Sequence, residues 1–172
     1  MRGYLSSIDK QILDLVNGLA DRWNLLDQIF LKANEYGVYL FVCLLIFALF
    51  RYRRLFFYAL LSIALSRLAI VEGIRLFYKR PRPQEIMDEI KTLIIVSEPA
   101  FPSGHTVFYF AIASAFYFYD KRLGYIALAF AVFLSIARVY LGAHYPSDIL
   151  AGAVIGFGSS YLLNRLLGRY LV

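Results

Sequence analysis

The sequence predicts an all-α integral membrane protein, a bundle of about five transmembrane helices preceded by an amphipathic helix in the membrane interface. Hydrophobic residues make up 60% of the 172 residues and charged residues only 17%, a ratio that a soluble domain with a polar surface does not sustain. The apolar residues also gather in five runs. Because five spans leave little further chain, we expect one domain over residues 1–172, with an interfacial region at 1–35 and the bundle at 36–172.

The N-terminal segment shows a helical period. Its apolar residues recur at steps of three and four: Leu5, Ile8, Ile12, Val16, Leu19 and Trp23. Charged residues such as Asp9 take other faces, and Ser6 with Asp9 three residues later resembles a capping box. This helix is too polar to span a bilayer, so we expect it to lie in the interface; packing on a soluble partner is the less favoured interpretation.

The five apolar runs cover residues 36–50, 55–74, 106–119, 123–140 and 145–163. At 1.5 Å per residue each approaches or reaches the thickness of a bilayer. Basic clusters follow the first, third and fifth runs: Arg51, Arg53 and Arg54, then Lys121 and Arg122, then Arg165 and Arg169. All three clusters fall on one side, which the positive-inside rule makes cytoplasmic, and this places the loop 79–102 and the turn 142–145 outside.

Polar residues that a membrane protein avoids concentrate in three segments at the outer ends of the spans, at 75–83, 102–105 and 138–148. Guanidinium groups match phosphate oxygens bidentately, so Arg75, Arg82 and Arg138 predict a phosphate clamp. The alternative is that these are juxtamembrane anchors, but anchors favour the inner side and these arginines lie on the outer one.

The second segment contains Ser103, Gly104 and His105 at the start of a predicted span. Ser103 suits an N-cap position, and the backbone amides of a first helical turn can hold an anion. Gly104 lets an oxygen approach the backbone closely. Ser-Gly is common at helix starts, so this segment gains weight only from the other two.

His144 and Asp148 are four residues apart at the start of the fifth span and therefore share a helix face. The carboxylate can hold one ring nitrogen and leave the other as a nucleophile, with His105 protonating the leaving oxygen and activating water. A helix-capping Asp beside an interfacial His is the alternative for the pair alone. A zinc site is disfavoured by the nearby arginines, so we expect no metal and no cofactor.

Taken together, the three segments resemble the motifs K-x6-R-P, P-S-G-H and S-R-x5-H-x3-D of the type-2 phosphatidic acid phosphatase superfamily of membrane lipid phosphatases. The resemblance implies a phosphohistidine mechanism without a metal, at the extracytoplasmic face of a bacterial inner membrane. It assigns the nucleophile, its orienting partner and the general acid to His144, Asp148 and His105, and phosphate binding to Arg75, Arg82, Ser103, Gly104 and Arg138. The N-terminal helix is similar to that of the bacterial undecaprenyl diphosphate phosphatase type.

Two positions depart from the family pattern: Arg75 stands where Lys is usual, and Ala137 where Ser is usual. Inside the second span, Glu72 is expected to fix the Arg75 guanidinium or, equally, to pair with Arg67 and only lock the bundle. Lys79 is a further candidate near the site.

The expected substrates are lipid phosphates or diphosphates: undecaprenyl diphosphate, the 1-phosphate of lipid A, phosphatidylglycerol phosphate and phosphatidic acid. Membrane lipids are the expected surroundings, and nucleic acid is not an expected partner because the basic residues form no single stripe. An anion-gathering channel or transporter, or a non-catalytic lipid-binding protein, are the alternatives. The first needs a polar path through the bundle, and the second has no use for His144 beside Asp148.

Overall fold

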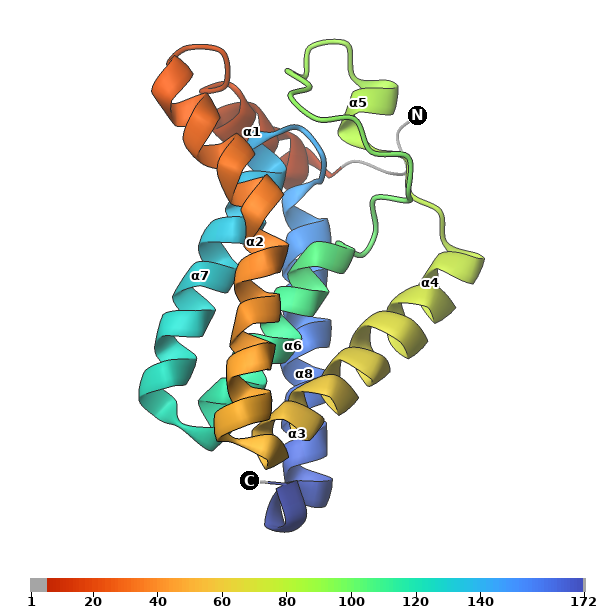
Figure 1. The fold of residues 1–172 in the computed structure, drawn as a ribbon. Helices are drawn as coiled ribbons and strands as arrows, with labels where there is room; N and C mark the ends of the chain where they lie inside the picture. Colours follow the sequence, from red (N-terminus) through yellow and green to blue (C-terminus); the bar gives the residue numbers. More distant parts are fainter. Residues whose placement is uncertain (1–5, 172) are drawn as a thin grey trace.

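The computed structural model describes residues 6–171, and the side chains of residues 6–167. Within that range the chain is helical and contains no strand, which confirms the predicted fold class (Figure 1). The elements are α1 (Ser7–Asn17), α2 (Asn24–Arg51), α3 (Arg53–Ile63), the π-helical segment η1 (Ala64–Val71), α4 (Glu72–Phe77), α5 (Pro83–Ile86), α6 (Gly104–Tyr119), α7 (Lys121–Tyr140) and α8 (Pro146–Leu171). Segments α3, η1 and α4 follow one another without a break and form a single rod.

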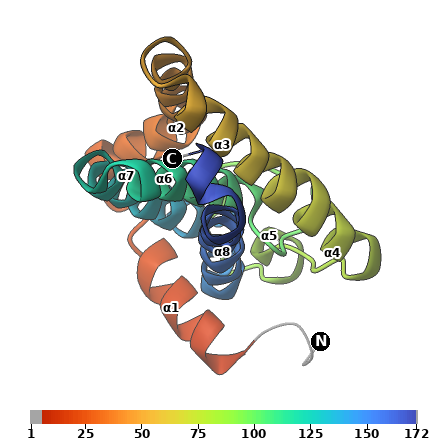
Figure 2. The same ribbon diagram turned by 90° about the horizontal axis from the view of Figure 1, so that it is seen from below.

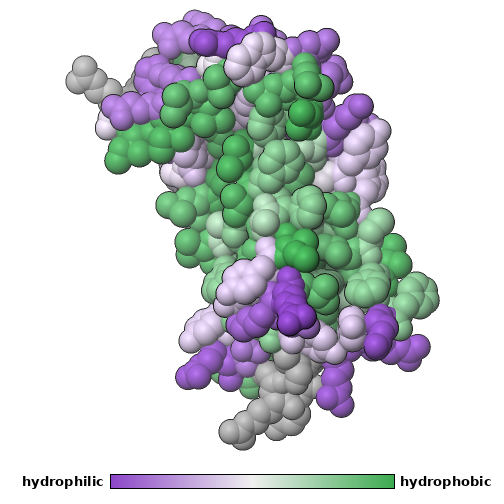
Figure 3. Space-filling view, turned by 90° about the vertical axis from the view of Figure 1, so that its left-hand side faces the viewer, coloured by the Kyte–Doolittle hydropathy of each residue, from purple (hydrophilic) through white to green (hydrophobic). Residues whose placement is uncertain are grey.

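Four helices in the described part of the chain are long and apolar enough to cross a membrane: α2, the rod Arg53–Phe77, α7, and α8 over Pro146–Leu167. An apolar band crosses the visible face between two polar ends (Figure 3). The third predicted span corresponds to α6, whose 16 residues reach only about 24 Å at 1.5 Å per residue. Helix α6 is also the most enclosed helix, since α3, α7 and α8 pack around it.

Small residues bring α8 close to α6. A Cβ atom at Gly156 would lie 2.6 Å from the carbonyl oxygen of Val107, and one at Gly152 would lie 3.0 Å from that of Ser103. Neither position accepts a larger side chain without a shift of the backbone, so glycine permits the approach. The contact fixes the start of α8 beside the start of α6, and this places the second and third polar segments together.

Helix α2 begins at Asn24, well before the apolar run that starts at residue 36. The segment before residue 36 contains polar residues such as Asp27, and the fold satisfies them. The Asp27 carboxylate accepts hydrogen bonds from the Tyr140 hydroxyl at 2.6 Å and from the backbone N–H of Asp21 at 3.2 Å. The helix therefore begins before the apolar run without burying an unpaired charge.

Helix α1 is the predicted amphipathic helix, but it ends at Asn17 instead of reaching Trp23, and Leu5 lies outside the described residues. The Ser6 hydroxyl accepts the Asp9 N–H at 3.0 Å, as the capping pattern predicts. The Asp9 side chain does not return that bond. It faces the protein with Leu13 and Asn17, while the predicted apolar face at Ile8 and Ile12 points outward.

The three polar segments gather at one end of the bundle, and the basic clusters that follow α2 and α6 lie at the other (Figure 1). The rod diverges from α8 toward its α4 end in both ribbon views (Figures 1 and 2). The polar end is thus the end at which the rod separates from α8, and a cavity lies there.

Candidate active site

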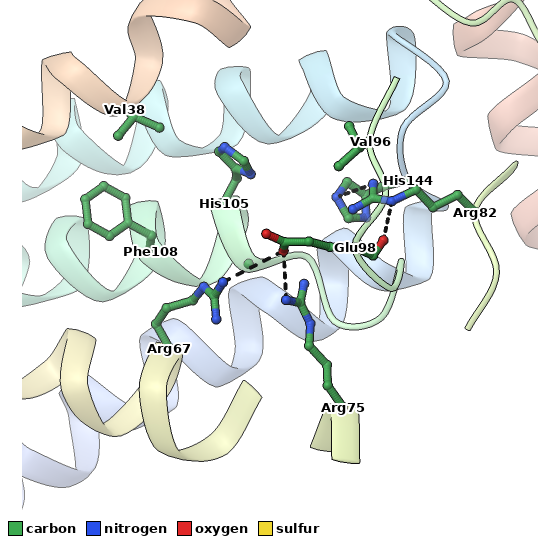
Figure 4. A pocket seen from close by; sticks show the side chains of 10 residues that line it. Val38, Arg67, Arg75, Arg82, Val96, Glu98, His105, Phe108 and His144 are labelled. Carbon is green, nitrogen blue, oxygen red and sulfur yellow. Dashed lines mark hydrogen bonds and ion pairs between the residues drawn. The ribbon is translucent and has the colours of Figure 1, made fainter. Parts of the chain in front are cut away.

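A cavity of about 240 Å³ opens at the polar end of the bundle (Figure 4). It is lined by side chains or backbone from five parts of the chain: Val38, Arg67, Arg75, Arg82, Val96, Glu98, Gly104, His105, Phe108 and His144. Residues from all three predicted segments therefore meet around one space. The lining combines guanidinium groups with both imidazoles, which suits a small anion.

His144 lies in the turn between α7 and α8 and is only 1% exposed. Its Nδ1 is 2.8 Å from the carbonyl oxygen of Ala100, and because a carbonyl only accepts, Nδ1 carries the proton. Burial lowers the pKa of His144 to about 4, so the ring is neutral at neutral pH. Its Nε2 therefore presents a lone pair, 3.2 Å from Nη1 of Arg82.

Asp148 lies beside the imidazole of His144, close to the nitrogen that bonds Ala100. Its Oδ2 is 3.6 Å from Nδ1 of His144, beyond a normal hydrogen bond, and accepts the backbone N–H of Tyr145 at 2.9 Å. Since α8 begins at Pro146, that bond caps the helix, so the capping interpretation holds as well. The carbonyl of Ala100 holds the imidazole, and Asp148 adds a negative charge behind it.

A buried ion network connects Asp148 to the N-terminal helix. No motif in the sequence predicts this network. Nη1 of Arg80 donates to Asp148 Oδ1 at 2.6 Å, and Nη2 donates to Asp9 Oδ2 at 2.8 Å. Asp9 also accepts the Ser147 N–H and hydroxyl, and the Arg80 guanidinium lies 4.0 Å above the Tyr145 ring. Burial alone would raise the pKa of Asp9, but the hydrogen bonds from Arg80 and Ser147 hold it below its ordinary value.

The sequence held one indication of this network. Asp9, Leu13 and Asn17 are spaced by four and share a helix face, and Asn17 also bonds the carbonyl oxygens of Lys91 and Tyr140. Asp9 and Asn17 on either side of Leu13 thus indicate that this face of the helix packs on other polar groups.

Arg82 is 2% exposed and is held at the site by hydrogen bonds from Nε and Nη1. Its Nε donates to the carbonyl oxygen of Glu98 at 2.6 Å and its Nη1 to that of Ala143 at 2.6 Å, beside His144. Burial lowers the pKa of Arg82, with the charge of Arg75 acting in the same direction. The guanidinium is thus held rigidly next to the lone pair of His144.

Arg138, on α7, is also 2% exposed and donates to the side-chain oxygen of Asn34. Its side chain does not line the cavity, but its charge contributes to the lowered pKa of His144, after the larger effect of burial. Arg138 therefore lies behind the imidazole and adds positive potential to the site.

The start of α6 supplies three of the predicted residues. Ser103 is fully buried at the N-cap position, but its hydroxyl accepts from the Thr106 hydroxyl at 3.1 Å and caps no backbone amide. A Cβ on Gly104 would lie 2.9 Å from Nε of Arg67, so glycine makes room for that guanidinium. His105 lines the cavity with His144 (Figure 4).

Arg75 anchors the rod side of the cavity. It donates to Glu98 Oε2 at 2.9 Å and to the carbonyl oxygen of Pro102 at 3.3 Å. Glu72 Oε1 contacts the guanidinium of Arg67 and lies 3.7 Å from Nη1 of Arg75, so both partners proposed for Glu72 are present.

Two charged residues of the cavity were not predicted as site residues: Arg67, which was considered as a partner of Glu72 that locks the bundle, and Glu98, which belongs to no motif. Lys79 is exposed and does not line the cavity. Among the described residues, no three His, Cys, Asp or Glu side chains are grouped so as to hold a metal ion. Chemically, the arrangement offers a neutral imidazole with a lone pair on Nε2, a second imidazole and several guanidinium groups.

The sequence matches the family model described as the PAP2 superfamily over residues 55–170. Undecaprenyl-diphosphatase BcrC of Bacillus subtilis is 28% identical over 160 residues, which cover 90% of this chain and 82% of that protein. A lipid A 1-phosphatase of Rhizobium johnstonii is 41% identical over 70 residues, which cover 41% of this chain but 29% of that protein.

Two solved structures have similar folds. The crystal structure of Aquifex aeolicus LpxE matches with a TM-score of 0.86 at 26% identity and covers 96% of this chain and 99% of that one. A PAP2-type phosphatidylglycerolphosphate phosphatase from Bacillus subtilis matches with a TM-score of 0.71 at 22% identity, covering 96% and 89%. The second likeness concerns the fold alone.

Proposed function

The chain belongs to the PAP2 superfamily and is a multi-pass membrane lipid phosphatase; from that premise we propose that it removes the terminal phosphate of a lipid phosphate or diphosphate, with His144 as the nucleophile. One observation carries the assignment. The Nδ1 proton of His144 is committed to the carbonyl of Ala100, so the lone pair is on Nε2, which accepts from Nη1 of Arg82 at 3.2 Å in a ring that lines the cavity.

In the first step of the proposed reaction, His144 Nε2 attacks phosphorus and the bond from phosphorus to the leaving oxygen breaks. His105 donates a proton to that oxygen, which leaves as the lipid alcohol or lipid monophosphate. The phosphorylated ring carries a positive charge, which the carboxylate of Asp148, 3.6 Å from Nδ1, stabilises.

In the second step, His105 takes a proton from a water molecule. The resulting hydroxide attacks phosphorus, the bond from phosphorus to Nε2 breaks, and inorganic phosphate leaves. Arg75 and Arg82 line the cavity where the phosphoryl oxygens gain charge, and Arg138 adds positive potential from behind.

We further propose that the site faces the extracytoplasmic side of a bacterial inner membrane. The support is the position of the basic clusters, which include exposed Arg53, Arg54 and Arg122, at the end of the bundle opposite the cavity. The relatives named above act on undecaprenyl diphosphate and lipid A by their names, and these remain candidate substrates with phosphatidylglycerol phosphate and phosphatidic acid.

The test is release of phosphate by the purified protein from a panel of these four lipids. His144→Ala is expected to abolish release, vanadate to inhibit it, and EDTA to leave it unchanged. Arg54→Gln, at the far end of the bundle, is the matched control and is expected to keep full activity. Retained turnover in His144→Ala would overturn the proposed nucleophile.

A further inference from the structure

Glu98 occupies the cavity as an internal anion. Its Oε2 accepts from Nη1 of Arg75 at 2.9 Å and lies 3.9 Å from Nη2 of Arg67. The hydrogen bond from Arg75 holds the pKa of Glu98 below its ordinary value, so the side chain is a carboxylate at neutral pH. It is nevertheless 60% exposed, which means that another anion can reach its place.

The two guanidinium groups around Glu98 are built into the wall. Arg67 rests against Gly104, where a Cβ would collide with its Nε, and Glu72 contacts both arginines. Arg75 is only 8% exposed, and its Nε is buried without a hydrogen-bond partner among the described residues. The pair therefore offers more donors than Glu98 uses.

These groups follow one another along the cavity (Figure 4). His144 and Arg82 lie at one end, Glu98 lies between, and the apolar side chains of Val38 and Phe108 lie at the other. A water molecule takes about 30 Å³ of liquid, so a cavity of about 240 Å³ has room for a group several times that size. The order fits a headgroup with a terminal phosphate at His144, an inner phosphate in the place of Glu98, and a hydrocarbon chain beginning at Val38 and Phe108.

We propose that Arg67 and Arg75 form a second phosphate subsite, filled by Glu98 in the substrate-free protein, which binds the inner phosphate of a lipid diphosphate. This inference rests on the proposed function and makes a lipid diphosphate the preferred substrate over a lipid monophosphate. Binding displaces the Glu98 carboxylate, because the inner phosphate and this carboxylate would occupy the same place between the two guanidinium groups. On the first phosphoryl transfer, the inner phosphate leaves with the lipid as its monophosphate.

The first test compares a prenyl diphosphate with the prenyl monophosphate of the same chain length, using the purified full chain. Arg67→Gln is expected to lower kcat/KM for the diphosphate about tenfold or more, as loss of a charge-assisted hydrogen bond does, and to change the value for the monophosphate far less. Arg54→Gln, an exposed arginine at the opposite end, is the matched control and should leave both values unchanged.

The second test uses Glu98→Gln, which keeps the shape of the side chain and removes its charge. Inorganic pyrophosphate is expected to inhibit this variant severalfold more strongly than the parent, while inhibition by inorganic phosphate changes less. A merely structural Glu98 would lower the melting temperature and leave the ratio of the two inhibition constants as it was.

Equal losses on both substrates in Arg67→Gln, or an unchanged ratio of inhibition constants in Glu98→Gln, would overturn the second subsite while leaving the phosphatase assignment intact. If the parent protein releases phosphate from neither prenyl substrate nor from any lipid of the panel, the proposed function itself fails. The two failures are therefore distinguishable.

Discussion

The two ends of the bundle use the same residue types in opposite ways. At the cavity end Arg80, Arg82 and Arg138 are 5% exposed or less, and each donates to a carboxylate or carbonyl oxygen. At the far end Arg53 and Arg54 are exposed. Basic residues at one end thus build a site, whereas those at the other meet water and lipid headgroups.

The difference teaches that burial, more than the number of charges, separates a functional arginine from an anchor. Removing a guanidinium from water is costly unless acceptors replace the lost hydration. At the cavity end the fold supplies such acceptors through Asp9, Asp148 and the carbonyl oxygens of the loops. An exposed arginine needs none, so it can be replaced with little effect.

The largest effect that would test this contrast is on stability. Asp9→Asn removes the charge that faces Arg80 and is expected to lower the free energy of unfolding by about 3–5 kcal/mol, the usual cost of breaking a buried ion pair. Thermal unfolding in detergent measures it. Asp14→Asn on the same helix is the control, since its side chain is 46% exposed, and it should cost less than about 1 kcal/mol. Equal losses in both variants would contradict the contrast.

The next largest effect is on turnover. Arg82→Gln leaves the carbonyl of Ala143 and the lone pair of His144 without their cationic neighbour. We expect kcat/KM for phosphate release to fall about 10²–10³-fold, as on loss of a transition-state donor. Arg53→Gln, at the far end, is expected to retain parental kinetics. A comparable loss in Arg53→Gln would show that position in the bundle does not matter.

A third prediction concerns pH. Because burial lowers the pKa of His144 to about 4, the unfolded chain binds a proton between pH 6.5 and 4 that the folded protein does not. The contribution of His144 to the free energy of unfolding is therefore fully present above pH 6.5 and is lost as the pH falls toward 4. Melting temperatures measured across this range are expected to fall in the parent protein and to fall less in His144→Gln. Parallel curves would show that His144 is not the group responsible.

The smallest expected effect is that of replacing Glu72. Its side chain is 49% exposed, between the buried arginines of the site and the exposed arginines of the far end. Glu72→Gln removes the carboxylate that contacts Arg67 and lies 3.7 Å from Nη1 of Arg75, while Glu98 remains beside both arginines. We expect a loss in turnover of less than about tenfold, with a modest drop in melting temperature, because half-exposed pairs contribute little. Full turnover with a lowered melting temperature would assign Glu72 to the bundle alone.

Much of the site was accessible from the sequence because the chemistry is carried by recognisable side chains. His105, His144, Arg75 and Arg82 were predicted as site residues and line one cavity. The Ala100 carbonyl was not predictable, since every residue has one and only the fold decides which meets His144. Glu98 likewise belongs to no motif, and its meeting with Arg67 depends on the path of the loop.

The sequence by itself determined the membrane class, the all-helical architecture and the separation of polar chemistry from basic anchors, because hydropathy and residue type are local properties of the chain. Only the tertiary structure decided how Asp9 meets Arg80, 71 residues away, and how His144 meets Ala100, 44 residues away. Such contacts arise from the packing of helices and loops, and no spacing along the chain encodes them. Helix α1 shows the limit clearly: the spacing of Asp9, Leu13 and Asn17 indicates a shared face, but only the fold shows that Arg80 is the partner of Asp9.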